Sequence, residues 1–277
     1  MMRCGLLMMS SACAGLRWFG GVVALGLLAG AGVQAQGFAA LVSPPRFELS
    51  VKPGERLREV LEISNAGAEV AKFRIRTADW ALDKNAAVAF DESLQPGSCR
   101  PWVAIERRDI SVPAGGKYRY RFEVAPPAEA VSGECRFALL IEGDDQKVQA
   151  SDNVSFPVSG RLGVIVYVSV GNTAPELAVV GTSVGSVNGE LMPLLNVRNT
   201  GNAHGRLSGF LSGTDAAGKK LDFTPATLPI LPGETRTISL AVNREVDEPT
   251  KIAYPIVIHG SLEWGDKTTP FEQRFAP

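Results

Sequence analysis

The sequence predicts an all-β protein of two tandem β-sandwich domains. Apolar and polar residues alternate with the period of two typical of half-buried strands in successive segments of the first half: 46–51, 72–77, 118–124, 137–141 and 154–170. Clusters of Pro, Gly and Asn separate these segments, and none of them shows a helical period. Many short strands with regular turn signals indicate a sandwich.

We expect residues 1–35 to be a cleaved export signal. Arg3 and Arg17 precede an apolar core of small residues at 21–31, and a small-x-small cleavage site ends the segment. The core has about half the length that a membrane-spanning helix needs. A lipid attached to Cys13 is the alternative, but the three residues before it lack the apolar residue of a lipobox.

The charge balance gives no reason to expect nucleic acid or an anionic membrane as a partner. The formal net charge is −1, and loss of the two positive charges of Arg3 and Arg17 with the signal would make it −3. About 240 residues remain after the signal, which is enough for two domains with separate cores.

Cys99 and Cys135 remain after the signal is removed. Two cysteines in an exported protein most often form a disulfide. In the loop-entropy model this cross-link would contribute roughly 3.5–4 kcal/mol, less any strain. Two unpaired buried thiols are the alternative.

The segment 154–170 is too long for an ordinary strand. Its even positions are Val, Phe or Leu except at Gly160. At about 3.3 Å per residue it would span roughly 55 Å, whereas strands usually have about five or six residues. Either the strand breaks at Gly160, or its first part presents its apolar residues to another protein; these are Val154, Phe156 and Val158.

The second half of the chain repeats motifs of the first half. The sequence LNVRNTG at 195–201 is similar to LEISNAG at 61–67, and LPGETR at 231–236 is similar to VPAGGK at 112–117. Each copy places an Asn-x-Gly turn after one strand and a Pro/Gly turn before a later strand. We therefore expect two similar domains, at 38–171 and 174–277.

No pattern in the sequence is typical of a catalytic or metal site. His204 and His259 have no second His or Cys-x-x-Cys at ligand spacing. Ser183 stands between Gly181 and Gly185, but these glycines do not lead into a predicted helix as a nucleophile elbow requires, and no cysteine has a neighbouring His to activate it. We therefore predict that the protein is not an enzyme and has no metal site and no cofactor.

Basic residues gather on the polar faces of the predicted strands of the first domain. They are Arg46, Lys72, Arg74, Arg76, Arg119, Arg121 and Arg161. Each one alone is interpreted as ordinary solvated sheet surface. Together, beside an apolar edge, they would anchor a carboxylate while the edge pairs with an extended chain.

The first domain resembles the periplasmic pilus-assembly chaperones, the PapD-like proteins. SPPRF at 43–47 is similar to the family's first strand, and WVAI at 102–105 with ISVPAGG at 110–116 is similar to its middle strands. FALLIE at 137–142, with the strand from Val154, is similar to its last hairpin. The resemblance covers nearly all of the first domain but is weak in the second. It implies two immunoglobulin-like domains and a periplasmic location.

The resemblance also implies how a client is bound. In the family, the strand after the polar loop donates alternating apolar side chains to a pilus subunit that lacks a strand. The matching residues here are Val154, Phe156 and Val158. A basic pair in the family's cleft binds the subunit's terminal carboxylate, and Arg46 matches its first member. Gly163 stands where the second member, a lysine, is expected, and Arg161 on the same face would replace that lysine.

Two functions follow. The first is a periplasmic chaperone that caps incomplete pilus or fimbrial subunits by strand donation. Its partners are these subunits and, where one is used, an outer-membrane usher, and its exposed edge leaves self-association open. The alternative is a structural or adhesive exported protein of two immunoglobulin-like modules. In that case 154–170 is two strands that meet at Gly160 and both pack within their own sandwich.

Overall fold

The computed structural model describes residues 38–83, 86–144, 146–151, 154–158, 160–243 and 251–277, and only the backbone of those between 145 and 159. The predicted signal, 1–35, lies outside them. Within the described residues all elements are β-strands except one 3-10 turn, η1 (Arg100–Trp102), so the all-β fold class is confirmed. No helix in this part of the chain is long and apolar enough to span a membrane.

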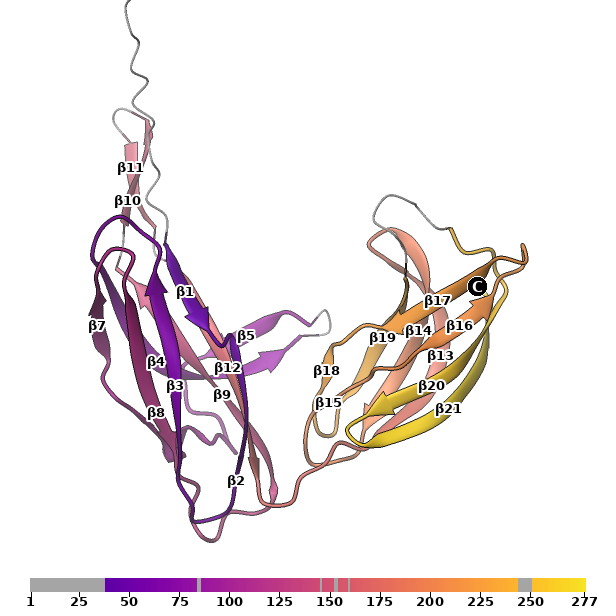
Figure 1. Cartoon of the computed structure of the whole chain (residues 1–277), viewed down its shortest axis with the longest axis horizontal. Coiled ribbons are helices and arrows are strands. Elements are labelled where there is room, and N and C mark those ends of the chain that lie inside the picture. Colours follow the sequence, from indigo (N-terminus) through magenta and orange to yellow (C-terminus); the bar gives the residue numbers. More distant parts are fainter. Residues whose placement is uncertain (1–37, 84–85, 145, 152–153, 159, 244–250) are drawn as a thin grey trace, which may run out of the picture. The chain divides into compact units, whose positions relative to one another are not determined.

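The first sandwich consists of two sheets (Figure 1). One sheet has the order β1-β3-β8-β6, and the other has the order β2-β12-β9-β4-β5, with β7 paired to β4. The strands of the first sheet are β1 (Ala40–Ser43), β3 (Leu57–Asn65), β6 (Val103–Ile105) and β8 (Lys117–Val124). Those of the second are β2 (Arg46–Val51), β4 (Ala71–Leu82), β5 (Val88–Asp91), β7 (Asp109–Val112), β9 (Gly133–Gly143) and β12 (Arg161–Val170).

The apolar positions of these strands meet in one core between the two sheets. Phe122 of β8 makes edge-to-face contacts with Phe47 of β2, at 5.2 Å between ring centroids, and with Phe137 of β9, at 6.1 Å. Each large apolar side chain buried in this way contributes about 1.5–3 kcal/mol before entropy costs. The period of two therefore predicted correctly which residues of these strands are buried.

The predicted disulfide is present in the first sandwich. Cys99, at the start of η1, is bonded to Cys135 of β9, with 5.7 Å between the two Cα atoms. Cys99 is fully buried in the core. The bond therefore fixes the chain before η1 to a central strand of the second sheet.

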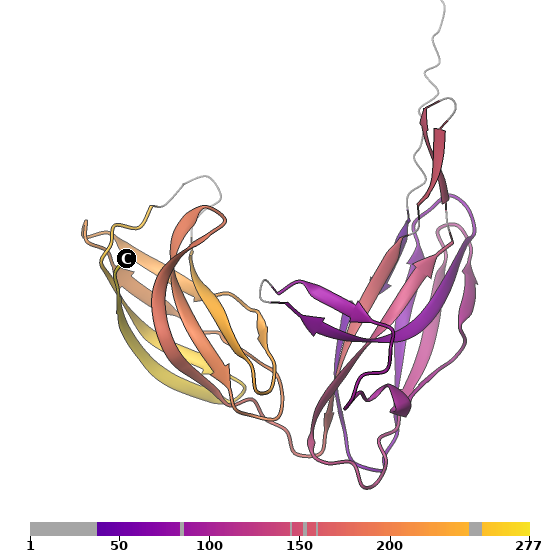
Figure 2. The ribbon, with the colours of Figure 1, turned by 180° about the vertical axis from the view of Figure 1, so that it is seen from behind.

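The long strand of the sequence is two strands, β11 (Val154–Val158) and β12, with the predicted break at Gly160. β12 pairs antiparallel with β9 along its whole length, and parallel with β2 only from Ile165 onward. β11 pairs instead with β10 (Gln146–Ser151). These two strands form a separate ribbon that extends beyond the end of the sandwich (Figures 1 and 2).

The second sandwich is formed by a seven-stranded sheet, β13-β14-β19-β17-β16-β20-β21, and a short pair, β15-β18. Its strands are β13 (Leu177–Val187), β14 (Glu190–Asn199), β15 (Gly205–Arg206), β16 (Leu211–Thr214), β17 (Lys220–Pro225), β18 (Pro229–Ile230), β19 (Thr235–Val242), β20 (Ile256–Trp264) and β21 (Lys267–Phe275). They enclose a separate core that includes Leu195, Phe223 and Ile258. We keep 38–171 and 174–277 as the proposed domain bounds.

A buried asparagine holds the Asn-x-Gly turn of the first sandwich. Asn65 Nδ2 donates to the carbonyl oxygens of Val112 and Pro113 at 3.0 and 3.1 Å, and to that of Glu69 at 2.6 Å. Its Oδ1 accepts a hydrogen bond from the Gly67 N–H at 2.9 Å. The two motifs that recur in the sequence therefore meet at this side chain.

The second sandwich repeats this arrangement. Asn199 Nδ2 donates to the carbonyl oxygens of Ala203 and Ile230, both at 2.8 Å, and Oδ1 accepts from the Gly201 N–H at 2.9 Å. Asn199 is fully buried, like its counterpart in the first sandwich. The sequence repeat is therefore a structural repeat, in which one amide satisfies the buried backbone of two turns.

Replacing either asparagine should destabilise its sandwich. Asn65→Ala and Asn199→Ala are each expected to lower the free energy of unfolding by about 2–4 kcal/mol, because buried carbonyls lose their donors. Urea unfolding followed by circular dichroism measures this change. Asn188→Gly is the control, because Asn188 lies in the β13–β14 turn with a φ of 51° that glycine adopts readily. A loss at Asn65 or Asn199 no larger than that of the control would contradict the role of these amides.

Candidate partner-binding edge and its charged cluster

β11 and the first part of β12 have an edge with no strand partner among the residues that the structure describes. β9 occupies one edge of β12 from Arg161 to Val170, but β2 occupies the other edge only from Ile165. β11 pairs with β10 and with no other strand in the described part of the chain. The backbone groups of 154–158 and 161–164 on the side away from β9 and β10 are therefore available to another strand. The alternative prediction, in which both strands pack within their own sandwich, stays untested for β11, because its side chains lie outside the described residues.

The three predicted donor residues lie on β11. The structure pairs Phe156 with Val148 and Val158 with Gln146, and it pairs Val154 with Ser151. Their side chains lie outside the described residues, so their role stays a prediction. Pro157 lies on the same strand, and proline is found in sheets at edges or bulges because it has no N–H to donate.

The structure does not bring the predicted basic pair together. Arg46 begins β2 opposite Ile165, and its Nε lies 2.9 Å from Glu48 Oε1. Arg161 lies on the same face but four residues before Ile165, which is about 13 Å along the strand. Arg46 therefore pairs with its neighbour Glu48, and Arg161 belongs to a different group of charges.

Phe90 of β5 fills the space above Gly163, where the resemblance implies a lysine. A Cβ atom on Gly163 would lie 2.1 Å from Phe90 Cζ, so any side chain there would displace the ring. Phe90 packs with Trp80, Leu140 and Ile165 on the outer face of the sheet. The hairpin of β4 and β5, seen in Figure 2, therefore covers the position expected for the second basic residue.

Arg161 belongs to a cluster of four charged residues with Arg76, Glu142 and Glu92, which we call the Arg76–Arg161 cluster. Arg76 on β4 and Arg161 on β12 lie on the two neighbours of β9 and both contact the carboxylate of Glu142. Glu92, directly after β5, bridges them with its two oxygens. Oε2 lies 2.7 Å from Arg76 Nη1, and Oε1 lies 3.3 Å from Arg161 Nη2.

Glu142 is held ionised by the two arginines. Burial opposes the charge, but the hydrogen bond from Arg76 and the charges of Arg161 and Arg76 outweigh it, so the pKa of Glu142 lies below the ordinary 4.5. The hydrogen bond to Glu142 in turn raises the pKa of Arg76. Two arginines and two glutamates give the cluster a formal charge of zero.

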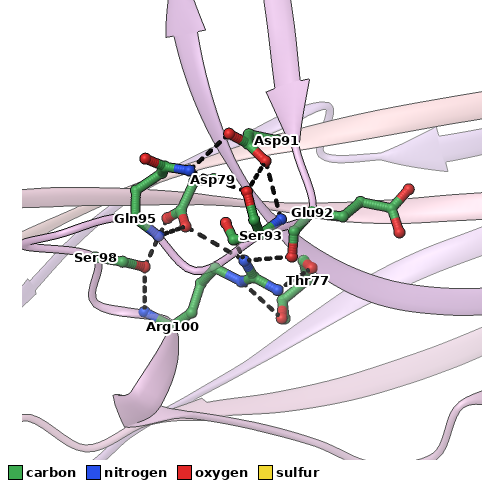
Figure 3. Close-up of polar contacts among 8 residues, drawn as sticks. All are labelled: Thr77, Asp79, Asp91, Glu92, Ser93, Gln95, Ser98 and Arg100. Atoms are coloured by element: carbon green, nitrogen blue, oxygen red, sulfur yellow. Dashed lines mark hydrogen bonds and ion pairs between the residues drawn. The ribbon is translucent and has the colours of Figure 1, made fainter.

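Arg100 fixes the backbone at Glu92. Its guanidinium donates to the carbonyl oxygens of Thr77, Glu92 and Ser93 at 2.8, 3.0 and 3.2 Å (Figure 3). It also pairs with Asp79 at 3.3 Å, and these two side chains are only 15% and 9% exposed. Arg100 therefore ties the segment after β5 to the middle of β4.

Asp79 holds the rest of that loop. Its carboxylate accepts hydrogen bonds from the Gln95 N–H at 3.0 Å and from the Ser98 hydroxyl at 2.6 Å (Figure 3). The disulfide of Cys99 follows immediately. The loop from Glu92 to Cys99 is thus fixed to the sandwich along its length.

A cleft of about 370 Å³ lies beside the Arg76–Arg161 cluster, where β12 begins. It is lined by Arg74, Arg76, Glu142, Gly143, Asp144, Gly160 and Arg161.

The other predicted basic residues lie apart from the cluster. Arg74 pairs with Asp109 at 3.4 Å. Arg119 and Arg121 are on β8 in the other sheet, so the predicted basic residues do not form one face. Among the described residues no group of His, Cys, Asp or Glu side chains is placed to hold a metal ion.

Sequence reasoning missed both glutamates of the cluster. The position of Glu142 could have been predicted. It lies two residues after Leu140 and four after Ala138 in β9, so all three side chains are on the same, outer face of the sheet. Glu92 gives no such signal. It reaches Arg76 and Arg161 only because the β4–β5 hairpin folds over the sheet.

The chain was compared with family models, curated proteins and solved structures. No family model and no curated protein matches the chain. The crystal structure of the class 5 fimbriae chaperone CfaA is 12% identical, over 86% of this chain and 99% of that chain, with a TM-score of 0.46. The complex of the SafA pilin with the SafB chaperone from Salmonella enterica is 13% identical, over 86% of this chain and 97% of that chain, with a TM-score of 0.45. The CsuC–CsuE chaperone–tip adhesion subunit complex from Acinetobacter baumannii is 16% identical, over 86% of this chain and 99% of that chain, with a TM-score of 0.42.

The depressed pKa of Glu142 predicts a pH-dependent stability. Because the folded pKa is below the ordinary 4.5, the stabilisation is present above that value and is lost as pH falls through the folded pKa. Between pH 6 and pH 3 the wild-type protein should lose more unfolding free energy than Glu142→Gln does. Urea unfolding across this range measures the difference, and parallel curves for the two proteins would contradict it.

Proposed function

We propose that this chain is a periplasmic chaperone that caps incomplete pilus or fimbrial subunits by donating a β-strand. The observation that carries the proposal is the unpaired edge of β11 and early β12, on a strand that leaves its own sandwich. The resemblance of the first domain to the pilus-assembly chaperones supports the class of client. An outer-membrane usher and self-association through the same edge stay predictions.

Binding would combine backbone pairing with apolar burial. An extended client strand pairs with the free N–H and C=O groups of 154–158 and 161–164 and so completes the ladder on that side. Val154, Phe156 and Val158 then enter the core of the client. Three such side chains contribute on the order of 5–8 kcal/mol before the entropy costs of association. No covalent bond is made or broken in this binding, so the proposal needs no catalytic group.

β2 sets the limit of the client strand. Because β2 occupies the edge of β12 from Ile165 onward, pairing with a client ends at residue 164. A client strand that ends there has its terminus in line with the start of β2, where Arg46 lies opposite Ile165. Arg46 is therefore the predicted basic residue that we expect the terminal carboxylate of the client to approach first.

Phe156→Asp should abolish client capture and leave the fold intact, because a buried carboxylate in the client core is far costlier than the phenyl ring it replaces. Capture is measured as pilus subunit that co-purifies with the tagged chain from the periplasm. Ser155→Asp is the matched control, because it adds the same charge at the neighbouring position of the same strand and should keep most of the capture. Wild-type capture by Phe156→Asp would refute strand donation by β11.

A further inference from the structure

The ribbon of β10 and β11 joins its sandwich through a pair of glycines. Gly143 is the last residue of β9, and Gly160 directly precedes β12. The Gly143 N–H donates a hydrogen bond to the carbonyl oxygen of Gly160 at 3.1 Å, so the two glycines face each other where the ribbon leaves the sandwich (Figure 1). Glycine has the widest backbone freedom of any residue. The pair is therefore the place at which the ribbon can pivot.

The side chain of Phe38 covers both glycines. A Cβ atom on Gly160 would lie 2.0 Å from Phe38 Cγ, and a Cβ atom on Gly143 would lie 2.8 Å from Phe38 Cδ2. Both distances are shorter than a carbon–carbon contact, which is about 3.5–4 Å. Neither glycine has a positive φ, so the ring, and not the backbone conformation, keeps a side chain from these positions. The ring therefore occupies the space that two side chains would take.

Phe38 is itself held by the other sheet. The carbonyl oxygen of the next residue, Ala39, accepts a hydrogen bond from the Ala66 N–H at 2.7 Å, and β1 begins directly after it. The ring packs edge-to-face on Phe73 of β4, at 6.0 Å between centroids, and Phe73 is the partner of Gly143 in the sheet. Phe38 therefore connects the edge of one sheet to the root of the ribbon on the other sheet.

The ribbon depends on such a contact at its root. A two-stranded ribbon is at best marginally stable by itself. In the described part of the chain, β10 and β11 pair only with each other. The direction of the ribbon must therefore be set where it meets the sandwich, and Phe38 touches both of its chains there.

We propose that Phe38 is a clamp that holds the β10–β11 ribbon in one direction, and that it is a positioning residue for the donated strand. The role in donation rests on the proposed function. The clamp does not, because it is measured in the chain alone. A ribbon that is held in one direction loses less freedom when a client strand pairs with it, so the client binds more tightly.

Amide hydrogen exchange at Gly143, followed by NMR, tests the clamp. Phe38→Ala should make this amide exchange about tenfold faster, because the ring no longer holds the two glycines in place. The amide of Leu139, on the part of β9 that is paired on both sides, reports any loss of stability of the whole sandwich. Val42→Ala is the matched control, because Val42 lies on β1 and packs against the same core. It should accelerate exchange at Gly143 no more than at Leu139.

Gly160→Ala tests the same contact from the other side. The added methyl group would displace the ring, so exchange at Gly143 should accelerate as it does in Phe38→Ala. In the double variant Phe38→Ala, Gly160→Ala the methyl group has room, so exchange should be no faster than in Phe38→Ala alone. Gly133→Ala, on the same strand as Gly143, is the control, because a Cβ atom there meets nothing within 4 Å.

Three results would overturn the clamp. The first is an unchanged rate at Gly143 in Phe38→Ala. The second is an equal acceleration in Gly133→Ala or Val42→Ala. The third is an effect of Gly160→Ala that persists in full after Phe38 has been removed, because the methyl group would then act without the ring.

Client capture separates the clamp from the function on which its use rests. An unchanged rate at Gly143 in Phe38→Ala, when the wild-type chain captures subunit, defeats the clamp and leaves the chaperone function standing. A faster rate, when the wild-type chain captures no subunit, upholds the clamp and defeats the chaperone function. When both hold, Phe38→Ala should retain about threefold to tenfold less pilus subunit than Val42→Ala, because its ribbon must be ordered by the client. Equal retention by these two variants would overturn the positioning role.

Discussion

The pairing of β9 with β12 is the constraint on which the rest of the first sandwich depends. Its register runs without a break from Arg161 opposite Glu142 to Val170 opposite Gly133. This register sends the even residues of β12 into the core and places Arg161 beside Glu142 on the outer face. A shift by one residue would exchange the two faces and remove both the core and the cluster.

The same hairpin produces the candidate binding edge. Beyond the pairing of β9 with β12 the two segments continue as β10 and β11, and no other strand in the described part of the chain pairs with them. β2 covers β12 only from Ile165 onward. The segment 154–170 therefore has two environments: β12 stabilises its own sandwich, and the edge of β11 is the part that we propose pairs with another chain.

Alternation and turn chemistry predicted the strands, the two sandwiches, the break at Gly160 and the repeated Asn-x-Gly turns, because these are local properties of the chain. The alternation of apolar and polar residues predicted which face of their strand Arg119 and Arg121 occupy. It could not predict the sheet to which that strand belongs, because sheet membership depends on long-range pairing. β5 has four residues and no alternating signal, so the covering of Gly163 by Phe90 could not be read in advance. The pairing of Arg46 with Arg161 as the carboxylate-binding pair stays a prediction.

Strand donation is tested most directly by amide hydrogen exchange along 154–164 with and without a bound pilus subunit. Successive N–H groups of a strand point to opposite edges, so alternate amides, those not used by β10 and β9, should become protected when the subunit binds. Unchanged exchange at these amides in a chain that holds its subunit would contradict donation of this strand.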